Sequence, residues 1–412
     1  MKFSTLAVAA FAAVCAAAPS KKALKFGFTK SYSENELVAR SKSAEVSLAN
    51  YYNIQYLVHM GLGTPAQWFD VSIDTGSSIT WVRATGQEGQ FNSSASKTYK
   101  SADSDFVAHY GDGGYAEGPW AKDTLSVGGV TLEQFQFGAA SDSQGSQIFA
   151  MGPPGDPDAS FALRMAKDGY TNTAAFSLNL DSHDSKTGSL LMGAVDASKI
   201  DGGLALVSLL DYYLYAVTLE GVSFNGRNAL DVARLAILDS GSTGMTIPYT
   251  TYWTLVDALE LYQTSAGPVA SQSQYDAWTK EDAHLTFTFQ GKEIHIPLTE
   301  VFFPRSDYVT TPQGQEKAYL WRVDAGGDRG QILLGDSFLR AAYVVYDQAN
   351  KQVALGQAKH GGAEKLEEIV SGPAGIPLAT KAPSSVTYSS DLPFTTAASQ
   401  PSSTAALGPK TV

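Results

Sequence analysis

The 412-residue sequence contains a single cysteine, Cys15, which lies within an apolar stretch near the N-terminus. This shortage excludes a disulfide framework and a cysteine-based zinc site in the rest of the chain. The six histidines show no His-Glu-x-x-His or similar ligand spacing, so we expect no metal and no cofactor. Packing alone must stabilise the folded protein.

Charged residues are also scarce, at 17 % of the chain, and the formal net charge is −12. No Lys/Arg cluster persists beyond the first few dozen residues, which argues against nucleic-acid binding. Residues 1–45 are the exception, with seven basic and three acidic side chains. Such a cationic leader can dock over an acidic cleft, or it can be a solvated N-terminus.

Long hydrophobic runs are missing too, and the apolar stretch of residues 6–18 is shorter than the roughly 20 residues that cross a bilayer. Lys2 precedes it and small residues follow, which is typical of a secretory signal peptide at residues 1–18. We therefore expect a secreted, extracellular protein without a membrane anchor. Residues 19–45 would be a propeptide, and the Ser/Thr/Pro/Ala-rich residues 360–412 a disordered tail.

Between these ends, short runs rich in Val, Ile, Tyr, Phe and Thr alternate with Gly, Pro, Asn or Asp about every ten residues. This alternation predicts an all-β protein. Helical spacing of apolar residues occurs at residues 161–167 and 250–262. Asn92 begins an Asn-Ser-Ser sequon in a polar loop and is a candidate glycosylation site.

One motif occurs twice, as Asp74-Thr75-Gly76-Ser77 and Asp239-Ser240-Gly241-Ser242, each after an apolar strand. A single copy would be read as an ordinary turn. The copies are 165 positions apart. Further along the chain, each copy has a matching run of two apolar residues and a glycine, which ends at Gly152 for the first and at Gly335 for the second. This repeat predicts two similar lobes, at residues 46–205 and 206–359. Two facing carboxylates would share one proton and could activate a water molecule.

Further segments make a family resemblance definite. Residues 56–67 contain a Gly-Thr-Pro turn, residues 109–114 read His-Tyr-Gly-Asp-Gly-Gly, and residues 332–340 read Ile-Leu-Leu-Gly-Asp-Ser-Phe-Leu-Arg. Over residues 51–357 the chain resembles a pepsin-like aspartic protease of the secreted fungal type. The resemblance implies an all-β, bilobal fold with the active site between two similar β lobes. It covers the Gly-Asp-Ser-Phe segment that alone would mimic an esterase nucleophile motif.

The resemblance also implies roles for individual residues. Asp74 and Asp239 would be the catalytic pair, on loops kept tight by Gly76 and Gly241 and tied together by Thr75 and Ser240. Ser77 and Ser242 would hydrogen-bond the carboxylates. Tyr110 would close over the substrate, with Trp81 as its partner, and Asp112 would accommodate a basic substrate residue.

The implied protein is a monomeric aspartic endopeptidase, made as a zymogen with its own propeptide as a partner. It would cleave proteins and peptides at acidic pH, prefer large apolar residues beside the scissile bond and tolerate Lys. The alternative is a catalytically silent binding or inhibitor protein on the same fold. The chain departs from the family pattern in lacking a disulfide in its second lobe and in carrying Phe149 where glycine is usual.

Overall fold

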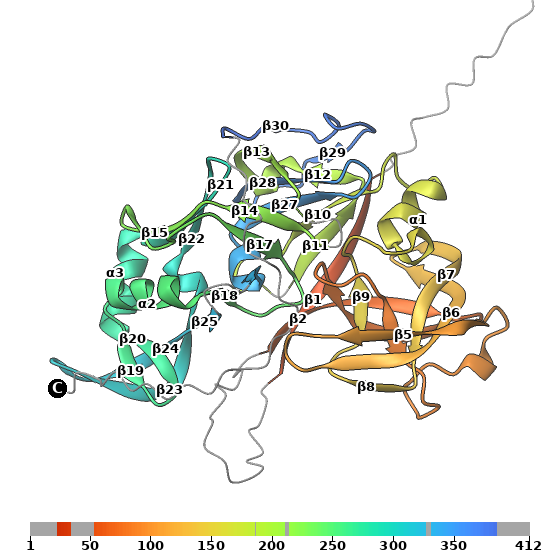
Figure 1. Cartoon of the computed structure of the whole chain (residues 1–412), viewed down its shortest axis with the longest axis horizontal. Helices are drawn as coiled ribbons and strands as arrows, with labels where there is room; N and C mark the ends of the chain where they lie inside the picture. The colour runs from red at the N-terminus through yellow and green to blue at the C-terminus, as the bar shows by residue number, and fades with distance from the viewer. Residues whose placement is uncertain (1–22, 34–52, 186, 211–213, 327–330, 385–412) are drawn as a thin grey trace, which may run out of the picture.

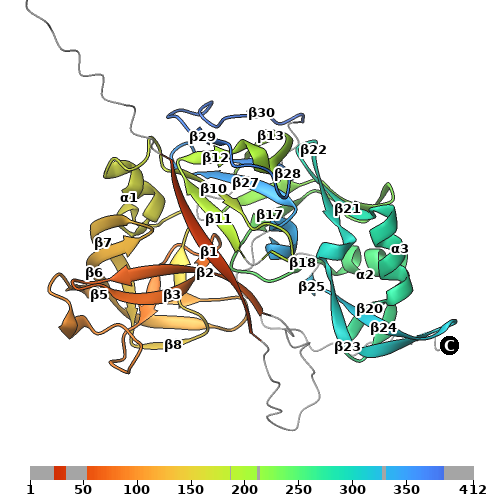
Figure 2. The ribbon, with the colours of Figure 1, turned by 180° about the vertical axis from the view of Figure 1, so that it is seen from behind.

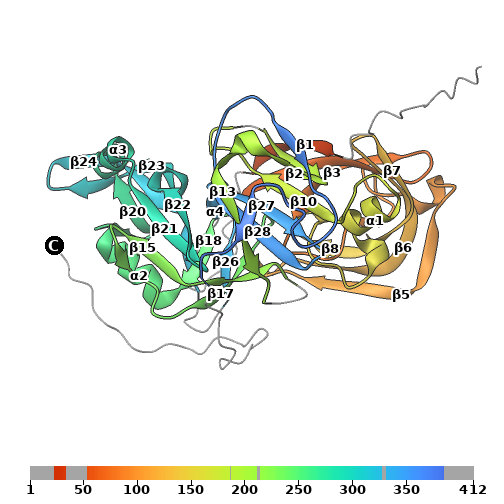
Figure 3. The same ribbon diagram turned by 90° about the horizontal axis from the view of Figure 1, so that it is seen from above.

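The computed structural model describes residues 23–33, 53–185, 187–210, 214–326 and 331–384 (Figure 1). The expected signal peptide, the greater part of the expected propeptide and the end of the expected tail lie outside these ranges. Strands dominate the described chain, which confirms the all-β prediction. Two lobes flank a central sheet, as the view from above in Figure 3 shows.

The largest sheet runs from the centre of the molecule into the N-terminal lobe. Across it the strands follow the order β30 (Ala379–Lys381), β13 (Ile200–Ser208), β28 (Gln352–Ala358), β27 (Ala342–Asp347), β10 (Ala175–Asn179), β11 (Thr187–Met192), β1 (Leu24–Ser33), β2 (Asn53–Leu62), β3 (Gln67–Asp74), β9 (Ile148–Ala150), β4 (Trp81–Arg83), β7 (Val130–Ala140), β6 (Tyr115–Val127) and β5 (Lys100–His109), with β8 (Asp142–Gln144) paired to β6.

Three smaller sheets build the C-terminal lobe. The first comprises β14 (Ala216–Leu219), β17 (Arg234–Leu238), β26 (Ile332–Leu334), β18 (Met245–Pro248) and β25 (Val323–Gly326). The second comprises β16 (Arg227–Asn228), β15 (Gly221–Phe224), β21 (His284–Phe289) and β22 (Lys292–Pro297). The third comprises β19 (Tyr262–Thr264), β20 (Gly267–Ser271), β24 (Gly314–Trp321) and β23 (Phe302–Thr311).

Helices are few and short in the described chain. The helices predicted at residues 161–167 and 250–262 form as α1 (Phe161–Lys167) and α2 (Tyr249–Ala258), the second ending four residues earlier than expected. Helices α3 (Gln272–Glu281) and α4 (Asp336–Leu339) were not expected. Phe149 packs against Phe161 at the start of α1, with ring centroids 5.0 Å apart, and is fully buried. Where the family usually has a glycine, Phe149 therefore contributes a buried aromatic ring to the core.

The same arrangement of four strands occurs in both lobes. In the N-terminal lobe β3 runs parallel to β9, and β4 runs parallel to β7. In the C-terminal lobe β17 runs parallel to β26, and β18 runs parallel to β25. A Cβ on Gly152 would lie 2.5 Å from the Ser77 carbonyl oxygen, and one on Gly335 would lie 2.3 Å from that of Ser242. The two apolar-apolar-Gly signatures thus place equivalent glycines behind equivalent loops.

Strand β1 is an interior strand of the central sheet. It pairs antiparallel with β11 on one side and with β2 on the other, and Figure 2 shows it crossing the molecule between the lobes. Phe26 and Phe28 are buried in the main hydrophobic core. The described part of the leader therefore belongs to the sheet rather than lying over a cleft.

The expected boundary of the C-terminal tail at residue 360 is wrong. Strand β29 (Leu366–Glu368) pairs with β12 (Ala194–Asp196), and β30 extends the central sheet beside β13. Ile369 and Ile376 are buried in a core shared with the last strands of the sheet. These two isoleucines anchor residues 360–384, although the surrounding composition is typical of a disordered tail.

Candidate active site

The two aspartates stand at equivalent places in the two lobes. Asp74 is the last residue of β3, and Asp239 directly follows β17. A Cβ on Gly76 would lie 2.6 Å from the Asp239 carboxyl carbon, and a Cβ on Gly241 would lie 2.6 Å from that of Asp74. Only glycine allows this approach, which brings the carboxyl groups together between the lobes.

Each carboxylate accepts two hydrogen bonds from its own loop. The Gly76 amide donates to Asp74 Oδ1 at 2.7 Å, and the Ser77 hydroxyl donates to Oδ2 at 2.5 Å. In the second loop the Gly241 amide donates to Asp239 Oδ1 at 2.9 Å, and the Ser242 hydroxyl donates to Oδ2 at 2.7 Å. The two acids are therefore held in the same way.

The residues beside the aspartates join the two loops. The Thr75 hydroxyl donates to the Leu238 carbonyl oxygen at 2.9 Å, and the Ser240 hydroxyl donates to that of Ile73, also at 2.9 Å. Thr75 and Ser240 are both buried. Because each hydroxyl reaches the strand that precedes the opposite aspartate, the lobes are tied together directly behind the carboxyl pair.

Asp74 is buried and lies against a second acid. Burial raises the pKa of Asp74 well above its usual range, and the charge of Asp239 raises it further. Hydrogen bonds from Ser77 and Gly76 oppose this rise without cancelling it. The pair therefore retains a proton at a pH where an isolated aspartate would be ionised.

A hairpin between β5 and β6 extends over the cleft. The Trp81 indole N–H donates to the Tyr110 hydroxyl at 2.6 Å, so the structure brings together the tyrosine and tryptophan that the sequence singled out. The exposed Asp112 accepts a hydrogen bond from the Gly114 amide at 2.8 Å through Oδ1. One oxygen of Asp112 thus stabilises the tip of the hairpin.

A cleft of about 730 Å³ lies between the lobes and contains the aspartate pair. Seven of the predicted substrate-contacting and catalytic residues line it, namely Asp74, Gly76, Tyr110, Asp112, Asp239, Gly241 and Ser242, and so does Ser77. Thr75, Trp81 and Ser240 lie behind its surface. Four of the described lining residues are aspartates, and one of them, Asp324, was not singled out by the sequence analysis. None of the described lining residues is lysine or arginine.

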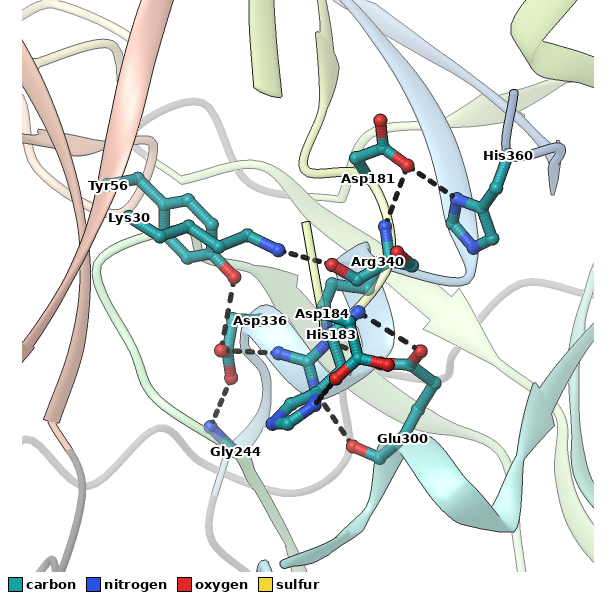
Figure 4. A network of polar contacts seen from close by, with 11 residues as sticks. Lys30, Tyr56, Asp181, His183, Asp184, Gly244, Glu300, Asp336, Arg340 and His360 are labelled. Atoms are coloured by element: carbon teal, nitrogen blue, oxygen red, sulfur yellow. Dashed lines mark hydrogen bonds and ion pairs between the residues drawn. The ribbon is translucent and has the colours of Figure 1, made fainter. Parts of the chain in front are cut away.

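A buried ionic network contacts the segment that follows the second aspartate loop, at Gly244 (Figure 4). The Gly244 amide donates to Asp336 Oδ1 at 2.7 Å, and the Tyr56 hydroxyl donates to Asp336 Oδ2 at 3.2 Å. Arg340, which is fully buried, forms ion pairs of 2.5 Å with Asp336 and with Glu300. Burial alone would lower the pKa of Arg340, but Asp336, Tyr56 and Glu300 reverse this and raise it.

Strand β1 reaches the same network through Lys30. The Lys30 ammonium group donates to the Ser182 carbonyl oxygen and lies 5.7 Å from the centre of the Tyr56 ring. Burial and the neighbouring Arg340 lower the pKa of Lys30 to about 8, against the opposing effect of Glu300 and nearby aspartates. Sequence analysis missed this link because it depends on pairing between distant strands.

The expected glycosylation site lies on the surface. Asn92 is exposed and precedes the short helix η1 (Ser93–Ala95), where its side-chain oxygen accepts a hydrogen bond from the Ser94 amide. No group of three or more His, Cys, Asp or Glu side chains suited to a metal occurs within the described ranges. In the same ranges, no helix is long and apolar enough to cross a membrane.

Comparisons with known proteins agree with this geometry. The family model described as eukaryotic aspartyl protease matches residues 55–358. An acid protease from Saccharomycopsis fibuligera is 31 % identical over 80 % of this chain and 87 % of its own length. The aspartic proteinase yapsin-3 from Saccharomyces cerevisiae is 31 % identical over 93 % of this chain and 83 % of its own length.

A solved structure extends the agreement to the fold. The aspartic proteinase from Irpex lacteus matches with a TM-score of 0.64 over 83 % of this chain and 99 % of its own, at 20 % identity. This likeness confirms the predicted pepsin-like, bilobal architecture. Together with the family match, it shows that the chain belongs to the eukaryotic aspartyl protease family and is an aspartic-type endopeptidase.

Proposed function

We propose that the protein is a secreted endopeptidase that hydrolyses proteins at acidic pH, with Asp74 and Asp239 as its catalytic pair. The observation that carries this proposal is the mirrored pair of loops. They hold two carboxyl groups together at the base of a cleft, where burial and the charge of Asp239 raise the pKa of Asp74. One acid then stays protonated while its neighbour is ionised, which gives the site a general acid and a general base.

The reaction follows from that division. A water molecule held between the carboxyl groups loses a proton to the ionised aspartate and attacks the carbonyl carbon of the scissile bond. The neutral aspartate donates its proton to the carbonyl oxygen, which yields a neutral tetrahedral diol. Proton transfer to the amide nitrogen then allows the C–N bond to break, and the products are a carboxylic acid and an amine.

The cleft fits an extended peptide under the hairpin. Tyr110 and Asp112 lie on the hairpin side, and apolar side chains line the remaining walls, including Ile54, Ile79, Ile148, Ile237 and Leu333. An extended segment would pair its backbone with the hairpin as an added strand. Large apolar residues beside the scissile bond suit these walls, while the free oxygen of Asp112 can accept the ammonium group of a lysine.

Synthesis as a zymogen is part of the same proposal. Strand β1 belongs to residues 19–45, the expected propeptide, and it fills an interior position in the central sheet. Cleavage after it, within residues 34–52, would separate this strand covalently from the catalytic lobes. The expected signal peptide supports secretion, and Asn92 is accessible to a glycosyltransferase. We expect the mature enzyme to act as a monomer.

A cleavage assay after acid treatment tests the proposal. The full-length protein is incubated at acidic pH, and its digestion of a denatured protein substrate is followed with and without a statine-type inhibitor. We expect cleavage that the inhibitor abolishes, and N-terminal sequencing should place the new terminus within residues 34–52. A correctly folded, acid-treated protein that binds the inhibitor but cleaves nothing would instead favour a silent binding protein.

A further inference from the structure

Asp324 is an acid of the cleft that the proposed reaction does not use. It lies on β25 in the C-terminal lobe and lines the same cleft as Asp74 and Asp239. Strand β25 belongs to the C-terminal lobe, whereas β5 and β6 belong to the N-terminal lobe (Figure 1). Asp112 lies at the tip of the hairpin between β5 and β6. The cleft thus presents two additional carboxylates from two different lobes.

Strand pairing fixes where Asp324 lies relative to the catalytic loop. Strand β25 runs parallel to β18 with Asp324 opposite Thr246, and both residues line the cleft. Strand β18 begins six residues after Asp239, at Met245. Asp324 is therefore connected to the second aspartate loop through a single neighbouring strand, and it lines the same cleft as that loop.

The N-terminal lobe shows that the fold does not require an acid at this position. Trp81 and Thr246 each lie seven residues after the aspartate of their loop, and Trp81 pairs with Gly138 as Thr246 pairs with Asp324. The position equivalent to Asp324 is therefore held by a glycine, which has no side chain. Asp324 itself is exposed, so its carboxylate adds nothing to the packing of the core.

Within the described chain, the Asp324 carboxylate forms no side-chain hydrogen bond and no ion pair of 4 Å or less. Arg322 lies two residues before Asp324 in the sequence and is buried. The central carbon of its guanidinium group lies 5.4 Å from the centre of the Phe303 ring. Although Asp324 is exposed, the walls of the cleft exclude part of the water around its carboxylate and raise its pKa, and Arg322 opposes this rise only in part. Burial raises the pKa of Tyr252 on α2 to about 12, and the charge of the Asp324 carboxylate contributes to this rise. The negative charge of Asp324 is therefore only partly balanced by the positive charge of Arg322.

We propose that Asp324 binds a basic side chain of the peptide substrate on the C-terminal-lobe wall of the cleft. The enzyme thereby selects substrates with lysine or arginine at one position besides the one that Asp112 serves. Side chains of an extended peptide alternate between opposite faces, so acids on the two lobes contact different substrate residues. This inference rests on the proposed function, because it takes the cleft as the substrate site.

Peptide kinetics test the inference. A quenched fluorescent peptide with a fixed apolar pair at the scissile bond is varied by placing lysine or norleucine at one flanking position at a time. Norleucine has the length of lysine without its charge. At one position the wild-type enzyme should prefer lysine by about three- to fivefold in kcat/KM, the upper part of the range of a solvent-accessible ion pair. Asp324→Asn should abolish this preference and change cleavage of the norleucine peptides less than twofold.

Three variants make the result specific. Glu281→Gln removes an exposed acid of the same lobe that does not line the cleft, and it should leave the lysine preference unchanged. Asp324→Lys should convert the preference into one for glutamate at the same position. Asp112→Asn should affect a different substrate position.

An active enzyme whose ratio of lysine to norleucine cleavage is the same in wild type and Asp324→Asn at every position overturns the inference. Failure of the proposed function is distinguishable from this result, because the wild-type enzyme would then cleave none of the peptides.

Discussion

Thr75 and Ser240 exchange hydrogen bonds across the boundary between the lobes, because the amide of each residue donates to the hydroxyl of the other, at 3.1 and 2.9 Å. Each hydroxyl also donates to a carbonyl on the opposite strand. Four hydrogen bonds therefore fix the separation of the two aspartate loops. The relative position of the lobes at this point is set by side chains of the motif itself.

Removing one hydroxyl of this exchange should affect both stability and catalysis. Thr75→Val keeps the shape of the side chain but leaves the Ser240 amide and the Leu238 carbonyl without their partner. We expect a loss of about 1–3 kcal/mol in the free energy of unfolding and more than a tenfold fall in kcat. Urea denaturation and peptide kinetics measure the two effects. Thr75→Ser retains the hydroxyl and should stay near wild type; equal behaviour of the Val and Ser variants would contradict this role.

The raised pKa of Asp74 predicts how stability depends on pH. The folded state holds this proton more tightly than the unfolded state, so the stabilisation is complete below the unfolded pKa of about 4 and is lost as pH rises through the folded pKa. The Asp74→Asn variant has no carboxyl proton at this position, so it cannot lose this stabilisation as the pH rises. The variant should melt at least about 3 °C above wild type at pH 7, and this gap should close near pH 3.5. Parallel curves of melting temperature against pH would rule out the raised pKa.

The contact between Trp81 and Tyr110 should position the hairpin over the substrate. Tyr110→Phe removes the hydroxyl, and Trp81→Phe removes the indole donor. We expect each variant to lose about tenfold in kcat/KM, the order of one hydrogen bond to a partly buried group. The double variant should lose little more than either single one, because both substitutions break the same contact. Fully additive losses would show that the two residues act independently.

The two oxygens of Asp112 allow its structural and electrostatic contributions to be separated. Asp112→Asn can still accept the hydrogen bond from the Gly114 amide but has no charge, whereas Asp112→Ala loses both. The Asn variant should cleave lysine-containing peptides about fivefold more slowly and phenylalanine-containing peptides at the wild-type rate. The Ala variant should be slower on both. If the Asn variant loses equally on both peptides, Asp112 has no part in accepting lysine.

The network around Arg340 should dominate the stability of the C-terminal lobe. Arg340→Met leaves the carboxylates of Asp336 and Glu300 buried without their cation, which costs about 3–5 kcal/mol in other proteins. The urea midpoint should fall accordingly. Activity should fall with it under native conditions, since Asp336 holds the Gly244 amide. Lys122→Met, which removes a half-exposed ion pair with Asp158, is the matched control and should cost less than about 1 kcal/mol. Similar losses in the two variants would contradict the account of the network.

The aspartate site could be predicted because its chemistry is encoded locally. Short motifs place Asp74 and Asp239 beside their own hydrogen-bond donors, and the structure brings these motifs together as the repeat implied. Helix α3 was missed because its sequence lacks a regular apolar spacing. Its N-terminus nevertheless carries a capping box between Ser271 and Gln274, which is a signal that sequence alone contains.

Features that depend on pairing between distant segments could not be predicted. The position of β1 between β2 and β11 requires the register of three strands, and composition does not determine register. The contact between Gly244 and Asp336 likewise joins residues 92 positions apart. The carboxylate of Asp324 enters the cleft only because β25 pairs with β18. The roles of all these residues in catalysis and binding remain predictions.

The central claim is that Asp74 and Asp239 act together as one acid–base pair. Its most direct test is kcat/KM for an apolar peptide at acidic pH with mature wild type, Asp74→Asn and Asp239→Asn, each shown to be folded by circular dichroism. Asp70→Asn, a change at an exposed aspartate four residues from the site, is the control. We predict a loss of at least about a thousandfold in both site variants and none in the control. Full activity in either Asp74→Asn or Asp239→Asn would contradict the account.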